Sequence, residues 1–153
     1  MTISENIEIM RSFPAKLEAL VTDLTPEELT TAYNAPEWTV AQNVHHLADA
    51  HMNGYIRMKL TQTEDHPPLK TYEQALWAEI ADGKDADIRP SLAILRGLHQ
   101  RWVVFLESIE DWSRIGVHPE NGEMSLERLL QTYVNHCAAH TEQIQAVLDK
   151  MPK

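Results

Sequence analysis

Apolar residues recur at helical spacing in four long segments of this chain, and that periodicity limits the fold more than any other feature. The segments cover about residues 4–21, 40–63, 90–109 and 126–150. Only five glycines serve the 153 residues, fewer than the turns of an antiparallel sheet need. The pattern therefore predicts an all-α protein, a four-helix bundle formed by one domain, 1–153.

Residues with clear backbone preferences bound and interrupt these segments. Pro14 lies inside the first one and should kink it or split it in two, because proline has no N–H for the helix. Thr39 and Ser125 are candidate N-caps of the second and fourth segments. Consecutive prolines from Pro67 onward end the second segment, so residues 64–90 form a long helix 2–helix 3 connection with one short helix. A connection of this length in a compact domain is often functional.

The formal net charge of −10 argues against several classes of partner. Binding to a nucleic-acid backbone or to an anionic membrane needs clustered lysine and arginine, so we expect neither partner. No apolar run approaches the length of about 18 residues that suggests a membrane span. The N-terminal MTISENIEIM lacks the basic start of a signal peptide, and the single cysteine, Cys137, cannot form an intrachain disulfide. These features favour a cytoplasmic protein.

Eight histidines are many for a chain of this length, and two of them share a helical spacing. His136 and His140 are four residues apart, so on a helix both imidazoles lie at one edge of the apolar stripe of the last segment. Side chains there can face a pocket between helices, where bundles build metal sites. The spacing alone is a weak signal, because it also occurs by accident on surfaces. His66, His99 and His118 are scattered, and we interpret them as surface or boundary histidines.

A third metal ligand could come from VHHLADAH, residues 44–51. His51 lies on the apolar arc of this segment, which favours a core histidine bonded to a backbone carbonyl over a ligand. His46 lies on a second stripe with Asn53 and Arg57, which is either the lining of a wet cavity or a solvated helix face. Periodicity leaves these alternatives open.

The stretches EWTVAQNVHHLADAHMNGYIRMKLTQTEDHP and YVNHCAAHTEQI together resemble the DinB/YfiT-like superfamily of metalloenzymes, and its YfiT-type branch in particular. The resemblance covers most of the chain and includes SLAILRGLHQRW and the HPENG turn. It implies a four-helix bundle in which three histidines hold a divalent metal. Matched to this chain, the ligands are His46, directly before Leu-Ala-Asp, and the pair His136 and His140. His45 and His51 remain the alternatives to His46.

The resemblance also implies the chemistry. Three imidazoles suit zinc and nickel among the divalent metals and leave a position on the metal open. Such a metal activates either a bound thiol or a bound water. We therefore expect a low-molecular-weight-thiol-dependent S-transferase with a small-molecule substrate, and a metal-dependent hydrolase as the alternative. A third hypothesis is a metal-binding bundle with a structural or sensing role.

Two further expectations concern the pocket and the assembly. Asn53 and Arg57 follow His46 along its stripe and are candidate pocket residues for a polar or anionic part of the thiol cosubstrate. The family resemblance and two aromatic residues in polar surroundings, Trp77 and Trp112, favour a homodimer. We interpret Cys137 as a small core residue rather than a nucleophile.

Overall fold

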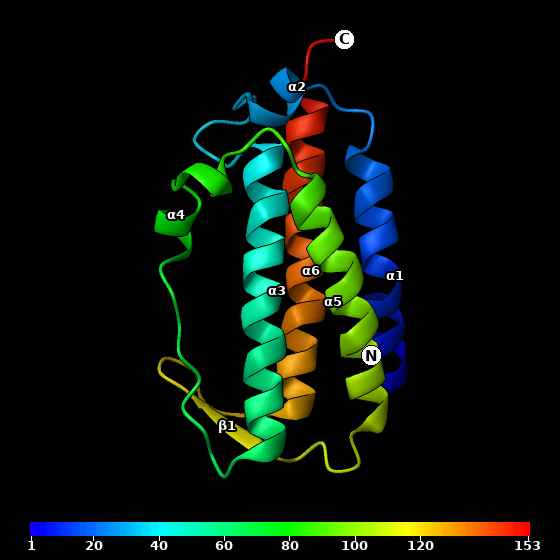
Figure 1. Cartoon of the computed structure of the whole chain (residues 1–153), viewed down its shortest axis with the longest axis vertical. Helices are drawn as coiled ribbons and strands as arrows, with labels where there is room; N and C mark the ends of the chain where they lie inside the picture. Colours follow the sequence, from blue (N-terminus) through cyan, green and yellow to red (C-terminus); the bar gives the residue numbers. More distant parts are fainter.

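Four long helices form a bundle, as the periodicity predicts (Figure 1). The computed structural model describes all 153 residues. The long helices are α1 (Ile3–Val21), α3 (Val40–Thr63), α5 (Arg89–Ser108) and α6 (Leu126–Asp149), and the short α2 (Pro26–Thr30) lies at the upper end in Figure 1. None of them combines the length and the apolar character that a membrane span requires.

The directions of the helices depend on one long connection. In Figure 1, α1 and α6 run upward, whereas α3 and α5 both run downward. Two successive long helices can run parallel only if the chain between them returns along the bundle. Residues 64–88 do so as a strap beside α3, which contains α4 (Gln74–Trp77) and the 3-10 helix η1 (Ala81–Gly83). The predicted long connection is confirmed, and its short α-helix has only four residues.

The packing of the four helices decides which segments meet. Both α1 and α3 pack against α5 and against α6. Because α3 and α6 are antiparallel neighbours, the N-terminal half of α3 lies beside the C-terminal half of α6 (Figure 1). The two histidine-bearing stretches of the sequence therefore meet in the upper half of the bundle.

Polar caps fix where two of these helices begin. Thr39 Oγ1 accepts a hydrogen bond from the Gln42 N–H at 3.1 Å, and Gln42 Oε1 accepts one from the Thr39 N–H at 3.1 Å. Ser125 Oγ accepts a hydrogen bond from the Arg128 N–H at 3.1 Å and caps α6 in the same way. Both predicted N-caps are confirmed, and they satisfy donors that the first helical turn leaves free.

Pro14 does not split the first helix, contrary to one of the two predicted outcomes: α1 is continuous from Ile3 to Val21. The proline removes one backbone donor, while the same face of α1 buries Met10, Phe13 and Leu17 in the core. Burial of this apolar face outweighs the loss of one helical hydrogen bond.

A small hairpin is the one feature that an all-α prediction leaves out. Strands β1 (Ile115–His118) and β2 (Gly122–Ser125) pair antiparallel, and Gly122 takes a φ of +71° at the turn. The hairpin also holds the start of the strap: the Val117 N–H donates to the Pro67 carbonyl and the Leu69 N–H to the Val117 carbonyl, both at 2.8 Å. The fold class is confirmed, with this two-stranded addition.

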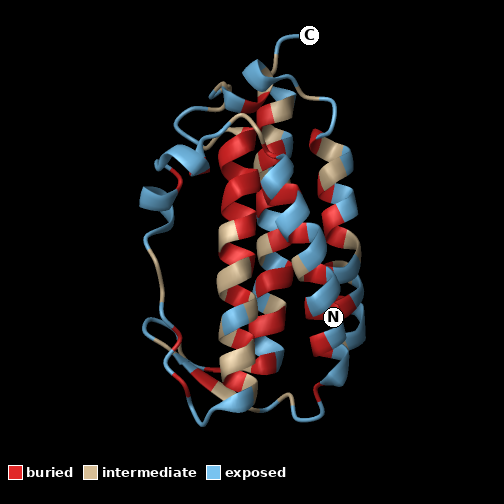
Figure 2. Ribbon diagram, in the orientation of Figure 1, coloured by how far each residue is buried: buried red, intermediate tan, exposed pale blue.

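Burial is uneven along α3, and this matters for the polar residues that it carries. Every residue from Val40 to Ala48 is buried, so the upper part of α3 is red almost all round in Figure 2. The bundle covers one side of this half, and α2 and η1 pack against α3 as well. Asn43, His45 and His46 are thus buried together; Asn43 and His46 face α6, whereas His45 faces Ser91 and the Asp85 carbonyl.

Candidate metal centre

Three histidines from α3 and α6 meet between these helices. His46, His136 and His140 each offer a ring nitrogen, and these nitrogens all lie within 4.8 Å of one another. His46 Nε2 lies 3.0 Å from His136 Nε2. The ring centroids of His136 and His140 are 4.3 Å apart, one helical turn along α6. The structure therefore brings together the three histidines that the family resemblance indicates.

The donor set fits a divalent metal. Burial, followed by repulsion from neighbouring histidines, lowers the pKa of His46 to about 4 and that of His136 to about 3. Burial also lowers the pKa of His140 to about 4, so all three imidazoles are neutral at pH 7. Neutral imidazole is the ligating form, and nitrogens around tetrahedral zinc stand roughly 3.3 Å apart for Zn–N bonds of 2.0–2.1 Å. The nitrogen–nitrogen distances in the cluster, 3.0 Å between His46 and His136 and at most 4.8 Å overall, are of the same order.

Asn43 orients His140 and was missed from the sequence. The Asn43 amide donates from Nδ2 to the Thr39 carbonyl at 3.0 Å, which leaves its Oδ1 facing His140 Nδ1 at 2.8 Å. An amide oxygen only accepts, so His140 carries its proton on Nδ1 and keeps the Nε2 lone pair for a metal. The available signal was spacing, because Asn43 precedes His46 by three residues and shares its helix face.

The two alternatives to His46 have other partners. His45 contacts Ser91 Oγ at 2.7 Å and the Asp85 carbonyl at 2.8 Å, so its ring joins α3 to the start of α5. His51 is fully buried below the cluster, with Nε2 3.2 Å from His136 Nδ1. The prediction that His51 bonds a backbone carbonyl is wrong, since both of its ring nitrogens face other histidines.

The remaining histidines and the cysteine divide into confirmed and wrong predictions. His99 is 1% exposed, so its interpretation as a surface or boundary residue is wrong. His66 is an exposed residue as predicted, and His118 is half-buried and accepts hydrogen bonds from two N–H groups of the hairpin turn. Cys137 is a buried core residue as predicted, and burial raises its pKa to about 12, which opposes a role as thiolate nucleophile.

The cluster opens to the surface beside Trp38. The Trp38 ring stacks over His140 at a centroid distance of 6.1 Å and lies 4.9 Å from the ring of His46. His140 also lines a cavity of about 310 Å³ with residues of the loop before α3, of α4 and of α6: Pro36, Glu37, Trp38, Gln74 and Gln143. A small molecule can therefore approach the histidines between this loop and the strap.

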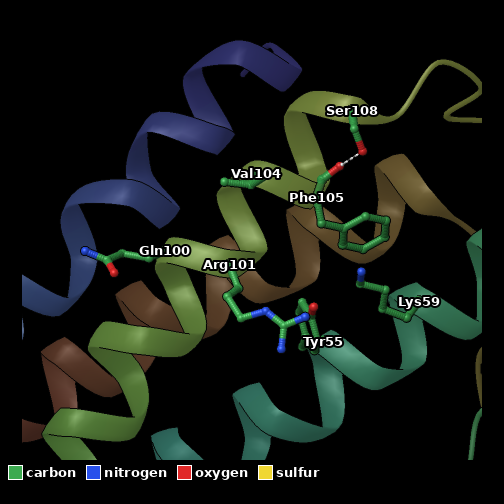
Figure 3. A pocket seen from close by; sticks show the side chains of 7 residues that line it. All are labelled: Tyr55, Lys59, Gln100, Arg101, Val104, Phe105 and Ser108. Carbon is green, nitrogen blue, oxygen red and sulfur yellow. Dashed lines mark hydrogen bonds between the residues drawn. The ribbon is translucent and has the colours of Figure 1, made fainter.

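A second groove lies elsewhere on the bundle (Figure 3). It has a volume of about 460 Å³ and lies between α3 and α5, with Tyr55 and Phe105 among its lining residues. Lys59 Nζ is 4.7 Å from the Phe105 ring centroid, and Arg101 Cζ is 5.7 Å from that of Tyr55. None of the lining residues belongs to the histidine cluster, so this groove is not the mouth of the candidate metal centre.

The candidate pocket residues on α3 already have protein partners. Asn53 Nδ2 donates to the carbonyl of Asp49, one turn earlier in the same helix, at 2.8 Å. Arg57 donates from Nε to the carbonyl of Lys70 in the strap at 3.0 Å and from Nη1 to Tyr133 Oη at 3.2 Å. Arg57 thus ties the strap to α3 and α6, and all of these hydrogen-bond partners are uncharged.

Comparisons with known proteins agree with this geometry. A family model of the DinB superfamily matches residues 10–144. YfiT of Bacillus subtilis, named as a candidate metal-dependent hydrolase, is 41% identical over 148 residues, which make up 95% of this chain and 83% of YfiT. A protein of Geobacillus thermodenitrificans with the same description is 43% identical over 149 residues, with 95% and 83% of the two chains covered.

Solved structures show the same fold. Bacillus subtilis YfiT, described as having an unusual four-helix bundle topology, superposes with a TM-score of 0.92 at 39% identity over 97% of this chain and 87% of its own. A mycothiol-dependent maleylpyruvate isomerase variant, 14% identical, matches with a TM-score of 0.75 over 94% of this chain and 61% of its own, a likeness of fold alone. The chain belongs to the DinB superfamily, among the YfiT-like proteins that are named as candidate metal-dependent hydrolases.

Proposed function

We propose that this protein is a divalent-metal-dependent enzyme in which His46, His136 and His140 hold the metal. We propose further that it transfers a low-molecular-weight thiol to an electrophilic small molecule. One observation carries the proposal: three neutral imidazole nitrogens converge beside a cavity that reaches the surface. Zinc and nickel both suit this donor set.

The reaction divides the work between the metal and the chain. A divalent metal in this site supplies Lewis acidity and lowers the pKa of a thiol or a water that it binds. Trp38 and Pro36 line the cavity with apolar surface, which limits the water around a reacting sulfur. In the proposed transfer the thiol proton goes to solvent, the sulfur bonds to the electrophilic carbon, and the leaving group departs with its electron pair.

Arg57 is the residue that we assign to the far end of the thiol cosubstrate. It lies 11 residues after His46 on α3, which is about 16 Å along a helix. None of the carboxylates is within ion-pair distance of it, and its partners are a carbonyl and a phenol. An extended cosubstrate with an anionic end could therefore bind Arg57 while its sulfur lies at the histidines, and Asn53 lies between the two points.

Hydrolysis is the second candidate, and the names of the relatives favour it. A hydrolase of this kind needs a group that takes a proton from the attacking water. Asp49 follows His46 by three residues, is half-buried, and has its pKa raised by burial and then by Asp82. It is the carboxylate that we assign to this role if the water reaction is the true one.

Turnover separates the candidates. Metal-loaded protein is incubated with small thiols and an electrophile such as monochlorobimane, and in parallel with a panel of esters and amides without thiol. The transferase proposal expects thiol conjugation that is lost in His140→Ala and kept in His66→Ala, whose side chain is exposed. It also expects a new charge-transfer band when a thiol is added to cobalt-substituted protein. Cleavage of an ester or amide without thiol selects the hydrolase, and no turnover with stoichiometric metal selects a structural or sensing role.

A further inference from the structure

A row of imidazoles continues from the histidine cluster into the core. His136 Nδ1 lies 3.2 Å from His51 Nε2, and His51 Nδ1 lies 2.7 Å from His99 Nε2. His99 Nδ1 lies 2.7 Å from the carbonyl oxygen of Met10. His51 and His99 are 0% and 1% exposed, so no water competes for these contacts. The row uses one group from each long helix: α6, α3, α5 and α1.

The carbonyl at the end of the row sets the direction of every hydrogen bond in it. A carbonyl oxygen only accepts, so His99 must donate from Nδ1. His51 and His99 are buried in the core and neither forms an ion pair with a carboxylate, so each ring is neutral and carries one proton. The bare His99 Nε2 then accepts from His51 Nδ1–H, and the bare His51 Nε2 accepts from His136 Nδ1–H. His136 is left with its lone pair on Nε2, the atom that faces His46.

Pro14 explains why the Met10 carbonyl is available. In a regular helix that carbonyl would accept from the N–H four residues later, and residue 14 is a proline without an N–H. The carbonyl freed inside α1 is instead bonded by His99. The proline that the sequence marks as a helix breaker therefore supplies the fixed end of the histidine row.

Packing holds the rings of the row in place. The Phe13 ring lies 5.9 Å from that of His51 and 5.8 Å from that of His99. The Trp102 ring meets both histidines edge-on, at 5.7 and 5.6 Å. Neither histidine can turn without displacing these two buried aromatic side chains.

We propose that His51 and His99 are positioning residues that fix the tautomer of His136, with the Met10 carbonyl as the anchor. The proposal rests on the proposed function, in which the Nε2 lone pair of His136 meets the metal. The row does not conduct protons out of the site, because its last member is a carbonyl that cannot pass a proton on. Groups that orient metal-ligating histidines in this way typically change metal affinity about 10–100-fold when they are removed.

The first test needs neither a variant nor a metal. Nitrogen-15 NMR of the ring nitrogens in metal-free wild-type protein distinguishes protonated from bare nitrogen. We expect His136 to be protonated at Nδ1 and bare at Nε2, with the same pattern in His99. A His136 ring that carries its proton on Nε2 overturns the proposal, whatever the protein does with metals.

The second test links the row to metal binding. His99→Leu removes the acceptor for His51 without touching a ligand, and Leu95→Ala is the control for a core lesion on the same helix, because Leu95 is fully buried and outside the row. We expect His99→Leu to mix the tautomers of His136 and to weaken zinc binding about tenfold in chelator competition. Leu95→Ala should keep the single tautomer of His136 and the zinc affinity of the wild type. Wild-type affinity in a folded His99→Leu protein overturns the proposal. If the wild-type protein binds no zinc, the proposed function is refuted. The NMR experiment then still tests whether the histidine row fixes the tautomer of His136.

Discussion

Gly54 of α3 lies against the ring of Tyr133 of α6 with no room for a Cβ, and it gives a sharp test of how the site is held. A Cβ at this position would lie 2.4 Å from Cε1 and from Cζ of Tyr133, and 2.9 Å from Cε2. Carbon atoms prefer separations of about 3.5–4.0 Å, so the ring or the helices must move by roughly 1 Å or more. Tyr133 has little freedom to move, because it is 6% exposed, packs on Trp102 and accepts a hydrogen bond from Arg57.

The size of the effect follows from two opposing terms. Overpacking of this kind costs about 1–3 kcal/mol, and replacing a helical glycine by alanine returns about 0.5–1 kcal/mol. We therefore expect Gly54→Ala to destabilise the fold by about 1–2 kcal/mol. Gly97→Ala is the matched control, because it lies in helix α5 with no atom within 4 Å of the new Cβ. It should stabilise the fold by about 0.5–1 kcal/mol.

Thermal and urea unfolding of the metal-free variants measure the difference directly. A gap of about 2 kcal/mol corresponds to roughly 4–8 °C in Tm for a chain of this size. A Cβ at position 54 would push against Tyr133 of α6, the helix that carries His136 and His140, so zinc affinity should fall in Gly54→Ala and stay unchanged in Gly97→Ala. The combination of Gly54→Ala with Tyr133→Leu should cost less than the sum of the single changes. Equal stability of the two alanine variants would refute the close-packing argument.

Four shorter predictions follow from the same structure. In urea titrations, the free energy of unfolding of the metal-free protein should fall as the pH is lowered from about 6.5 towards 4. The unfolded chain binds a proton on His99 in this range and the folded chain excludes it, and this group alone accounts for about 3 kcal/mol. A free energy of unfolding that does not change with pH contradicts this reasoning. Asn43→Leu should weaken zinc binding about 10–100-fold by releasing His140, whereas Asn43→Asp keeps an oxygen acceptor for His140 and should bind zinc more tightly than Asn43→Leu. Equal zinc affinities of the two variants in a competition assay would exclude a role of Asn43 in orienting His140. Arg57→Met should raise the KM for the thiol and leave the metal content unchanged, and an unchanged KM argues against a pocket role. Cys137→Ala should keep full turnover, since the thiol is buried and protonated. An inactive Cys137→Ala variant would show that the cysteine takes part in the reaction.

Much of the fold could be predicted from helical periodicity, and the reasons for the misses are local. The caps at Thr39 and Ser125 and the breaks after Thr63 are short-range features that the sequence displays. The hairpin was missed because its strands have four residues each, too few for an alternating pattern. Pro14 does not break α1, because a single missing donor is a small term beside the burial of a whole helix face.

The site shows where periodicity stops being informative. His99 follows Leu95 by four residues and precedes Trp102 by three, so the apolar arc could have placed it in the core; its neighbours Gln100 and Arg101 concealed the pattern. The choice between His46 and His51 could not come from an arc at all. The first half of α3 is buried on all sides by the bundle, α2 and the strap. Because segments distant in the sequence bury it, this half shows no periodic alternation of buried and exposed residues that would single out one face.

The central claim is that three particular histidines form a metal centre, and metal content tests it most directly. Purified protein is loaded with zinc, desalted and analysed for metal per chain, with His46→Gln compared against His45→Gln. The two residues are adjacent and both buried, yet only His46 faces His136 and His140. We expect one zinc per chain in wild type and in His45→Gln, and none in His46→Gln. Metal-free wild type, or equal loss of zinc in both variants, contradicts the account.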